Sequence, residues 1–175
     1  MIGVDRHAAM LDRDGWCVLG RALDPAILAG IGRDLDPRFE AAPFCQGAFY
    51  GEHTRRFGAL LARSQGVERL VMHPLVLALV EQMLLPWCDR IALNLTQAIE
   101  IHPGAPAQAP HRDQDMWGGP KGCLEYLVNV MWPLVPFTRE NGGTRLWTGS
   151  HLDCDVPVLP EDEAVVPHVL PGDAL

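Results

Sequence analysis

Residues 90–102 read RIALNLTQAIEIH, and their alternation of apolar and polar side chains decides the fold class. Apolar residues recur on one side of this stretch, at Ile91, Leu93, Leu95, Ile99 and Ile101. A period of two is typical of a β-strand with one apolar face. Gln97 interrupts that face, so its side chain either lines the interior of a barrel or bonds to a neighbouring backbone group. We therefore predict a strand from Arg90 to His102.

The residues before this strand carry helix signals. Asp24 and Pro25 suit the N-cap and first turn of a helix that we expect to run to about Leu35. A second helix is predicted over residues 74–84, with His73 as a possible cap. The same reading gives a short strand over 15–20, an irregular loop over 36–52, and short helices over 54–64 and 66–72.

The residues after position 102 favour further strands, which we expect over 124–134, 143–147 and 164–170. Helices followed by antiparallel strands indicate an α+β fold. We expect N-terminal helices packed on one sheet of a double-stranded β-helix, a jelly-roll or cupin-like scaffold. The prediction is one domain over 1–175, mainly helical through residue 88, with the jelly-roll core strands in residues 89–175.

Charge and composition exclude several classes of partner. A net charge of −8 argues against nucleic acid and against anionic membranes, because either would repel the chain. The most apolar stretch, 70–85, is too short and too interrupted to span a bilayer, and the N-terminus lacks the apolar run of a signal peptide. The five cysteines never form a CxxC pair, which indicates reduced thiols in the cytoplasm. We expect a cytoplasmic protein with a small-molecule substrate, and the oligomeric state cannot be predicted.

Residues 108–117, QAPHRDQDMW, contain the most informative chemistry. His111 and Asp113 are two residues apart, so at the end of a strand their side chains can reach one metal ion. With a second His, this pair would form the 2-His-1-carboxylate face that leaves positions open for a 2-oxo acid and dioxygen. Neutral imidazole and a carboxylate suit Fe(II). A lone His-x-Asp pair is nevertheless a weak signal, since most such pairs are solvated turn residues.

Four blocks of sequence give the pair a context: HRDQDMW (111–117), NVMWPL (129–134), FTRENGGTRLWTGSH (137–151) and PGDAL (171–175). In this order they resemble the phytanoyl-CoA dioxygenase family. The resemblance implies that His111 and Asp113 are iron ligands and that Gln108 binds 2-oxoglutarate. It makes Asn129 and Thr144 weaker candidates for contacts with the same cosubstrate.

The resemblance also implies an activity, namely that of an Fe(II)- and 2-oxoglutarate-dependent dioxygenase. Such an enzyme would use O2 to hydroxylate a small organic metabolite while 2-oxoglutarate is oxidatively decarboxylated to succinate and CO2. Asp113 favours hydroxylation, since related halogenases have a small residue at this position. Trp117 either walls the substrate pocket or packs in the core. We expect the loops 36–56 and 114–123 to determine the substrate.

Two elements of the family pattern are expected beyond Asp173, namely a second iron-binding His and an Arg that clamps 2-oxoglutarate. Because the chain stops at Leu175, we expect a fragment or an early-terminated chain. An alternative is a non-catalytic or degenerate jelly-roll protein that binds a small molecule. A metal-dependent hydrolase or isomerase of the cupin type would need more histidines near His111. His151 and His168 are better explained as a turn residue and a strand residue.

Overall fold

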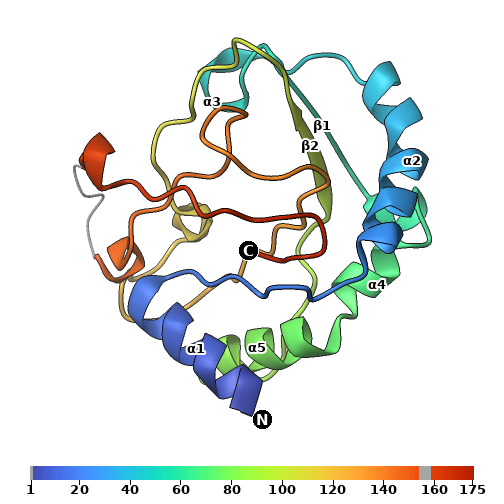
Figure 1. Cartoon of the computed structure of the whole chain (residues 1–175). Coiled ribbons are helices and arrows are strands. Elements are labelled where there is room, and N and C mark those ends of the chain that lie inside the picture. Colours follow the sequence, from blue (N-terminus) through green and yellow to red (C-terminus); the bar gives the residue numbers. More distant parts are fainter. Residues whose placement is uncertain (1, 154–158) are drawn as a thin grey trace.

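The first half of the chain is mainly helical in the computed structural model, which describes residues 2–153 and 159–175 (Figure 1). Its α-helices are α1 (Ile2–Asp14), α2 (Pro25–Ala41), the short α3 (Gly47–Tyr50), α4 (Val67–Val71) and α5 (Pro74–Leu84). Single 3-10 turns are η1 (Leu60–Ala62), η2 (Asp113–Met116), η3 (Ser150–Leu152) and η4 (Glu161–Glu163). Within the described ranges, no helix is long and apolar enough to cross a membrane.

The two predicted helix starts are confirmed by their caps. Asp24 accepts a hydrogen bond from the Ala26 amide at 2.8 Å, and Pro25 fills the first turn of α2. His73 caps α5 through Nδ1, which accepts from the amide of Val76 at 3.4 Å. The predicted end of α2 at Leu35 is wrong, because the helix continues to Ala41 and thereby buries Phe39.

The one regular sheet of the described residues pairs β1 (Thr54–Gly58) with β2 (Gln97–Ile101) in antiparallel register, with Arg55 opposite Glu100. The prediction of a helix over 54–64 is therefore wrong. Phe57 packs edge-to-face on Phe39 of α2 with 4.7 Å between ring centroids, which favours an extended segment beside that helix. The strand ends at Gly58, and the chain then turns into η1.

Helix α2 covers one face of this sheet (Figure 1). Ala98 is buried on the face that packs against α2, and Arg55 on the same side donates to the carbonyl of Phe39 at 3.1 Å. Opposite faces alternate along a strand, so Ile99 and Ile101 point away from α2, and they are 47 % and 50 % exposed. The face that carries Ile99 and Ile101 is called the open face below. The predicted apolar side chains of the strand exist, but α2 packs on the opposite face.

The remaining predicted jelly-roll strands are extended backbone that pairs at single residues. Bridges join Leu19 to Ala174, Phe137 to Val169 and Leu146 to Val165, and Met131 exchanges two backbone hydrogen bonds with Leu175 at 2.8 and 3.0 Å. The segments 15–20, 124–134, 143–147 and 164–170, predicted as strands, are thus not regular strands here, and 90–102 is regular only over β2. Prolines break the ladders, because a proline has no amide to donate. They lie at positions 133, 136, 167 and 171.

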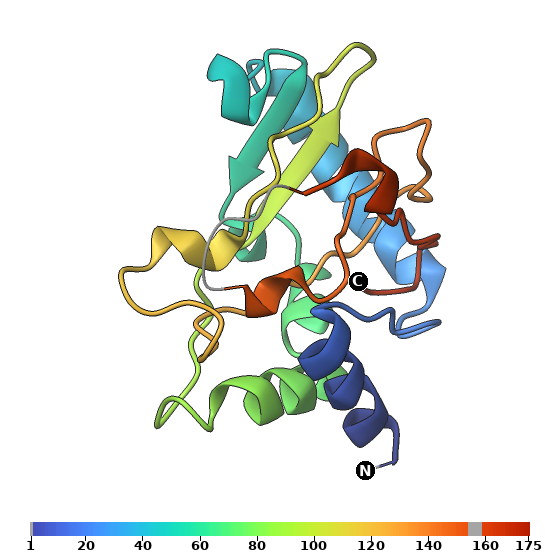
Figure 2. The same cartoon turned by 90° about the vertical axis from the view of Figure 1, so that its left-hand side faces the viewer.

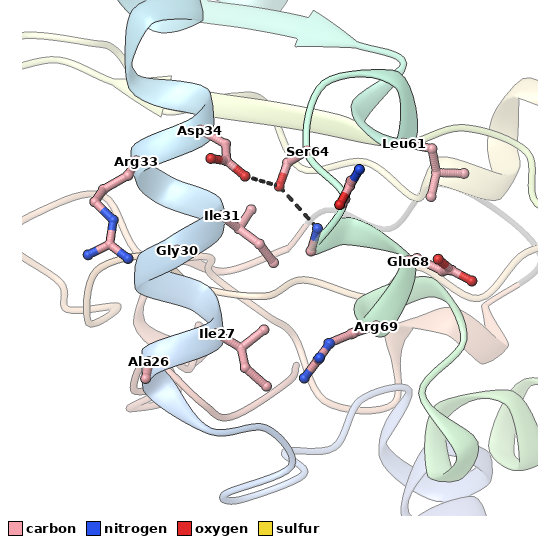
Figure 3. Close-up of a pocket in the computed structure, with 12 residues that line it drawn as sticks. Ala26, Ile27, Gly30, Ile31, Arg33, Asp34, Leu61, Ser64, Glu68 and Arg69 are labelled. Carbon is pink, nitrogen blue, oxygen red and sulfur yellow. Dashed lines mark hydrogen bonds between the residues drawn. The ribbon is translucent and has the colours of Figure 1, made fainter.

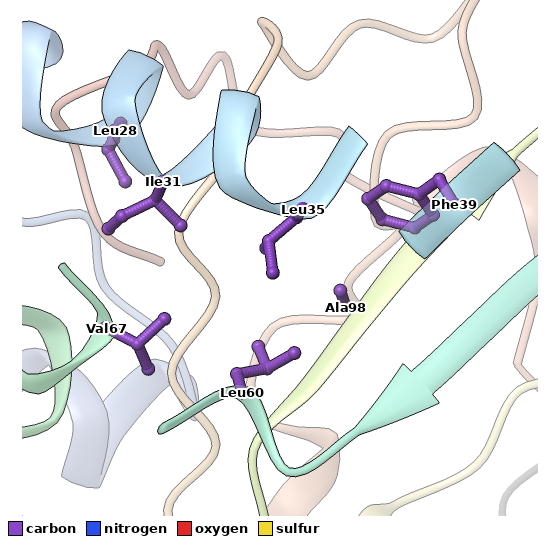
Figure 4. Close-up of a cluster of buried hydrophobic side chains, with 7 residues drawn as sticks. All are labelled: Leu28, Ile31, Leu35, Phe39, Leu60, Val67 and Ala98. Atoms are coloured by element: carbon purple, nitrogen blue, oxygen red, sulfur yellow. The ribbon is translucent and has the colours of Figure 1, made fainter. Parts of the chain in front are cut away.

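Two buried clusters form the core. The first lies between α2 and the sheet and contains Leu28, Ile31, Leu35, Phe39, Leu60, Val67 and Ala98 (Figure 4). The second lies between α1 and α5 and contains Ala8, Cys17, Leu19, Val76, Leu79 and Ala174. Trp132 packs against both clusters. The helical front and the extended back of the chain therefore share one continuous core.

Candidate metal site

His111 and Asp113 face each other in the structure. The His111 Nε2 atom lies 3.5 Å from Oδ1 of Asp113. The other ring nitrogen, Nδ1, lies 2.8 Å from the carbonyl of Ala109, so it carries the proton and donates to that oxygen. Nε2 is then the unprotonated ring nitrogen, and a metal-binding imidazole commonly donates its other ring N–H to a carbonyl in this way.

The pair lies in irregular backbone, not at the end of a regular strand as expected. A long loop leads from β2 to η2, the turn that begins at Asp113 (yellow in Figure 2). The side chains of His111 and Asp113 are 36 % and 45 % exposed, so both can be reached from solvent. The local hydrogen bond to Ala109, and not a strand pleat, aims the imidazole.

Helix α3 provides an aromatic wall beside the pair. The Phe49 ring packs edge-to-face on the His111 ring with centroids 4.9 Å apart, and Tyr50 packs on Phe49 at 5.4 Å. Gln108 is tied to the same helix, because its side-chain amide donates to the Phe49 carbonyl at 2.7 Å. Phe49 was not predicted as a site residue, although it lies in the loop 36–56 that was expected to help determine the substrate.

Of the other predicted site residues, only Asn129 contacts the pair directly. Its side-chain amide donates to Oδ2 of Asp113 at 2.5 Å. The Thr144 hydroxyl lies 3.5 Å from the Met131 sulfur, two residues along the chain from Asn129. Trp117 follows η2 and is 43 % exposed, and in the described part of the chain no hydrogen bond or ring contact joins it to His111.

Lys121 fixes the turn that starts at Asp113. Its ammonium group donates to the carbonyls of Gln114 and Trp117 at 2.7 and 2.5 Å and lies 4.7 Å from the centre of the Tyr126 ring. Gln114 inside this turn is buried. Sequence reasoning did not assign Lys121 a role, although it is the only lysine of the chain.

The donor set fits Fe(II) in part. An imidazole nitrogen and a carboxylate oxygen are ligand types that non-haem iron takes from protein, and here they lie 3.5 Å apart. Among residues 2–153 and 159–175, no three His, Cys, Asp or Glu side chains gather closely enough to hold a metal. The described residues thus provide two of the three donors of a 2-His-1-carboxylate face.

A cavity of about 800 Å³ lies elsewhere, between α2 and the segment from η1 to α4 (Figure 3). Its lining residues belong to 26–34 and 61–69, so it includes none of the predicted site residues. Ser64 donates to Asp34 at 2.6 Å across it, which links the two walls. This cavity is an open groove between packed elements and is separate from the His111–Asp113 pair.

Comparisons with known proteins identify the family of the chain. A family model described as phytanoyl-CoA dioxygenase (PhyH) matches residues 11–172. The multifunctional dioxygenase prhA of Penicillium brasilianum is 31 % identical, over 97 % of this chain and 62 % of the relative. Dioxygenase trt7 of Aspergillus terreus is 28 % identical, over 96 % of this chain and 62 % of that protein. The chain therefore spans about three fifths of the length of these relatives.

A solved structure shows the same fold. It is the crystal structure of the non-heme alpha ketoglutarate dependent epimerase SnoN from nogalamycin biosynthesis, with a TM-score of 0.62 and 20 % identity, covering 99 % of this chain and 71 % of that one. The expected cupin-like scaffold is consistent with this likeness, although the described residues form only one small sheet. Because the family model matches nearly the whole chain, the chain belongs to the phytanoyl-CoA dioxygenase family.

Proposed function

We propose that the protein is an Fe(II)- and 2-oxoglutarate-dependent dioxygenase that hydroxylates a small organic metabolite. In this reaction one oxygen atom of O2 enters a substrate C–H bond, and the other enters 2-oxoglutarate, which leaves as succinate and CO2. The observation that carries the proposal is the facing pair of His111 Nε2 and Asp113 Oδ1 in a chain of the PhyH family. The names of the curated relatives, which are dioxygenases, support it.

The residues of this chain would hold the reactants and control access to them. His111 and Asp113 would hold Fe(II), which with 2-oxoglutarate bound supplies the oxidising chemistry. Phe49 packs on the imidazole and Tyr50 packs on Phe49, so this aromatic pair would limit the entry of water on that side. Gln108 and Thr144 are proposed to contact 2-oxoglutarate, and Trp117 to contact the substrate.

We further propose that the protein works in the cytoplasm. Cys17, Cys45, Cys88 and Cys123 are free thiols in the structure, which suits a reducing compartment. The substrate is proposed to be a small molecule without a large anionic group, because the net charge of −8 opposes the binding of polyanions.

The test uses the intact gene product, loaded anaerobically with Fe(II) and 2-oxoglutarate and then exposed to O2. Succinate is measured with and without a panel of small metabolites. We expect succinate to form, and products to gain the mass of one oxygen atom. His111→Ala and Asp113→Ala should reduce succinate to the level of a protein-free control, whereas His168→Ala, at an exposed histidine, should leave it unchanged.

The succinate measurement tests whether 2-oxoglutarate is consumed, and the product mass tests whether an oxygen atom enters the substrate. Succinate without oxygen insertion would indicate another 2-oxoglutarate-dependent reaction, such as the epimerisation named for the structural relative. Equal succinate from the wild type and from both ligand variants would refute the assignment of His111 and Asp113. No succinate from the intact wild-type protein with any tested metabolite would favour the binding-protein alternative.

A further inference from the structure

The extended segment around residues 129–132 alternates between the core and the site. Val130 and Trp132 pack against the cluster between α1 and α5. Met131, which lies between them, is not among the residues packed against that cluster, so the side chains of this segment alternate between two sides. On that other side Met131 contacts Thr144, and Asn129 contacts Asp113. The packing of Val130 and Trp132 thus aims the Asn129 side chain at the carboxylate.

The backbone of this segment is also fixed beside Asn129. Met131, two residues further on, donates to the Leu175 carbonyl at 2.8 Å and accepts from the Leu175 amide at 3.0 Å. Leu175 is adjacent to Ala174, whose side chain is 1 % exposed in the same core cluster. Asn129 therefore extends from a backbone that is held by both hydrogen bonds and packing.

The two oxygens of the Asp113 carboxylate have different partners. Oδ2 accepts the Asn129 amide hydrogen at 2.5 Å, and Oδ1 lies 3.5 Å from His111 Nε2. A carboxylate held by one donor at one oxygen cannot turn freely about its terminal torsion. The donor is neutral, so it orients the carboxylate without cancelling the negative charge that a metal cation requires.

We propose that Asn129 is a positioning residue that holds Asp113 with Oδ1 toward the metal, and that it is not a 2-oxoglutarate ligand as the sequence suggested. The inference rests on the proposed iron site. Partners that orient metal ligands typically change metal affinity by about 10–100-fold when they are removed. Removal of Asn129 should therefore weaken metal binding, while the affinity of the metal-loaded protein for 2-oxoglutarate stays within about threefold.

The test measures Mn(II) binding by the EPR signal of free Mn(II), with the intact protein. Asn129→Leu keeps the shape of the side chain but removes the donor, and Asn129→Ala removes both. The control is Asn94→Leu, at an exposed asparagine outside the site. We expect the dissociation constant for Mn(II) to rise about 10–100-fold in both Asn129 variants and to stay unchanged in the control. Circular dichroism and the melting temperature identify variants that are merely unfolded.

A second titration, of 2-oxoglutarate at saturating Mn(II), distinguishes the two roles of Asn129. Unchanged Mn(II) affinity in folded Asn129→Leu protein refutes the positioning role. Weaker 2-oxoglutarate binding in that variant would then establish Asn129 as a cosubstrate contact. The assignment of His111 and Asp113 as metal ligands is refuted separately, if His111→Ala and Asp113→Ala bind Mn(II) as tightly as the wild type does. That result would overturn this inference too, because no metal ligand would remain for Asn129 to orient.

Discussion

Ala98 and Ile99 are neighbours in β2 that face opposite sides of the sheet, and the same substitution at each should have very different costs. Ala98 is 7 % exposed against α2, whereas Ile99 is 47 % exposed on the open face. The sequence pattern alone suggests that Ile99 is buried and Ala98 exposed, since isoleucine is the more apolar residue. Ala98→Asn and Ile99→Asn introduce an identical side chain, so their difference in unfolding free energy reports which face is packed.

The magnitudes follow from burial. At Ala98, an amide without a partner costs about 1–3 kcal/mol, and the added atoms overpack the site at a further cost of about 1–3 kcal/mol. We expect a total of ~3 kcal/mol for Ala98→Asn. Full burial of an isoleucine side chain stabilises by about 1.5–3 kcal/mol. Since about half of Ile99 is exposed, Ile99→Asn should cost ~1 kcal/mol.

Urea denaturation followed by tryptophan fluorescence measures both unfolding free energies. For a domain of this size, the melting temperature should fall by about 2–4 °C for each kcal/mol, so the variants should differ by several degrees. An Ile99→Asn variant that loses as much stability as Ala98→Asn would refute the assignment of faces. The face that carries Ile99 and Ile101 would then be packed in the folded protein.

Further predictions concern the core, a close backbone contact and a buried thiol. Leu28→Ala should destabilise the protein by about 2–5 kcal/mol because Leu28 is 1 % exposed, whereas Leu61→Ala, at a residue 47 % exposed, should cost much less in the same denaturation assay. Gly172→Ala should lower the unfolding free energy by about 1–3 kcal/mol, because Gly172 has a φ of 104° and an added Cβ would lie 2.8 Å from the Leu23 carbonyl oxygen. Thermal melting measures this loss, and an unchanged melting temperature would contradict the geometry. Burial raises the pKa of the Cys17 thiol, so iodoacetamide at mildly alkaline pH should label the exposed Cys88 and Cys123 before Cys17, as followed by peptide mass spectrometry. The unfolded chain loses the Cys17 proton at a lower pH than the folded one, so the contribution of Cys17 to stability should be intact below the ordinary thiol pKa and fall as pH rises above it.

The sequence predicted best those features that are encoded within a few neighbouring residues. The caps at Asp24 and His73 depend only on the residue itself and the next turn, and both were confirmed. The spacing of His111 and Asp113 can likewise be read directly from the sequence. Helix α1 was missed because its many charges hide the apolar face formed by Val4, Ala8 and Leu11, which packs in the second core cluster.

Features that depend on distant partners were predicted poorly. The segment TRRFG (54–58) has no clear period of its own, and it becomes β1 because it pairs with β2 more than forty residues later. Alternation in β2 predicted a strand correctly but could not indicate which face the helices cover. Small Ala98 fits closely against α2, whereas the bulkier Ile99 lies on the open face. The fit of the side chains against α2 decides which face of β2 is buried, and an alternation of residue types does not contain that information.

The candidate site combines both kinds of information. A His-x-Asp spacing places two side chains on one side only if the backbone between them is regular, and here it is not. The imidazole is oriented locally, by the Ala109 carbonyl, so a sequence reader could in principle anticipate it. The carboxylate is oriented by Asn129, sixteen residues away, whose own position depends on Met131 pairing with Leu175. The motif therefore specifies the chemical identity of the donors, whereas the fold specifies their mutual geometry. A substitution that disturbs the Met131–Leu175 pairing should accordingly weaken metal binding without touching either ligand.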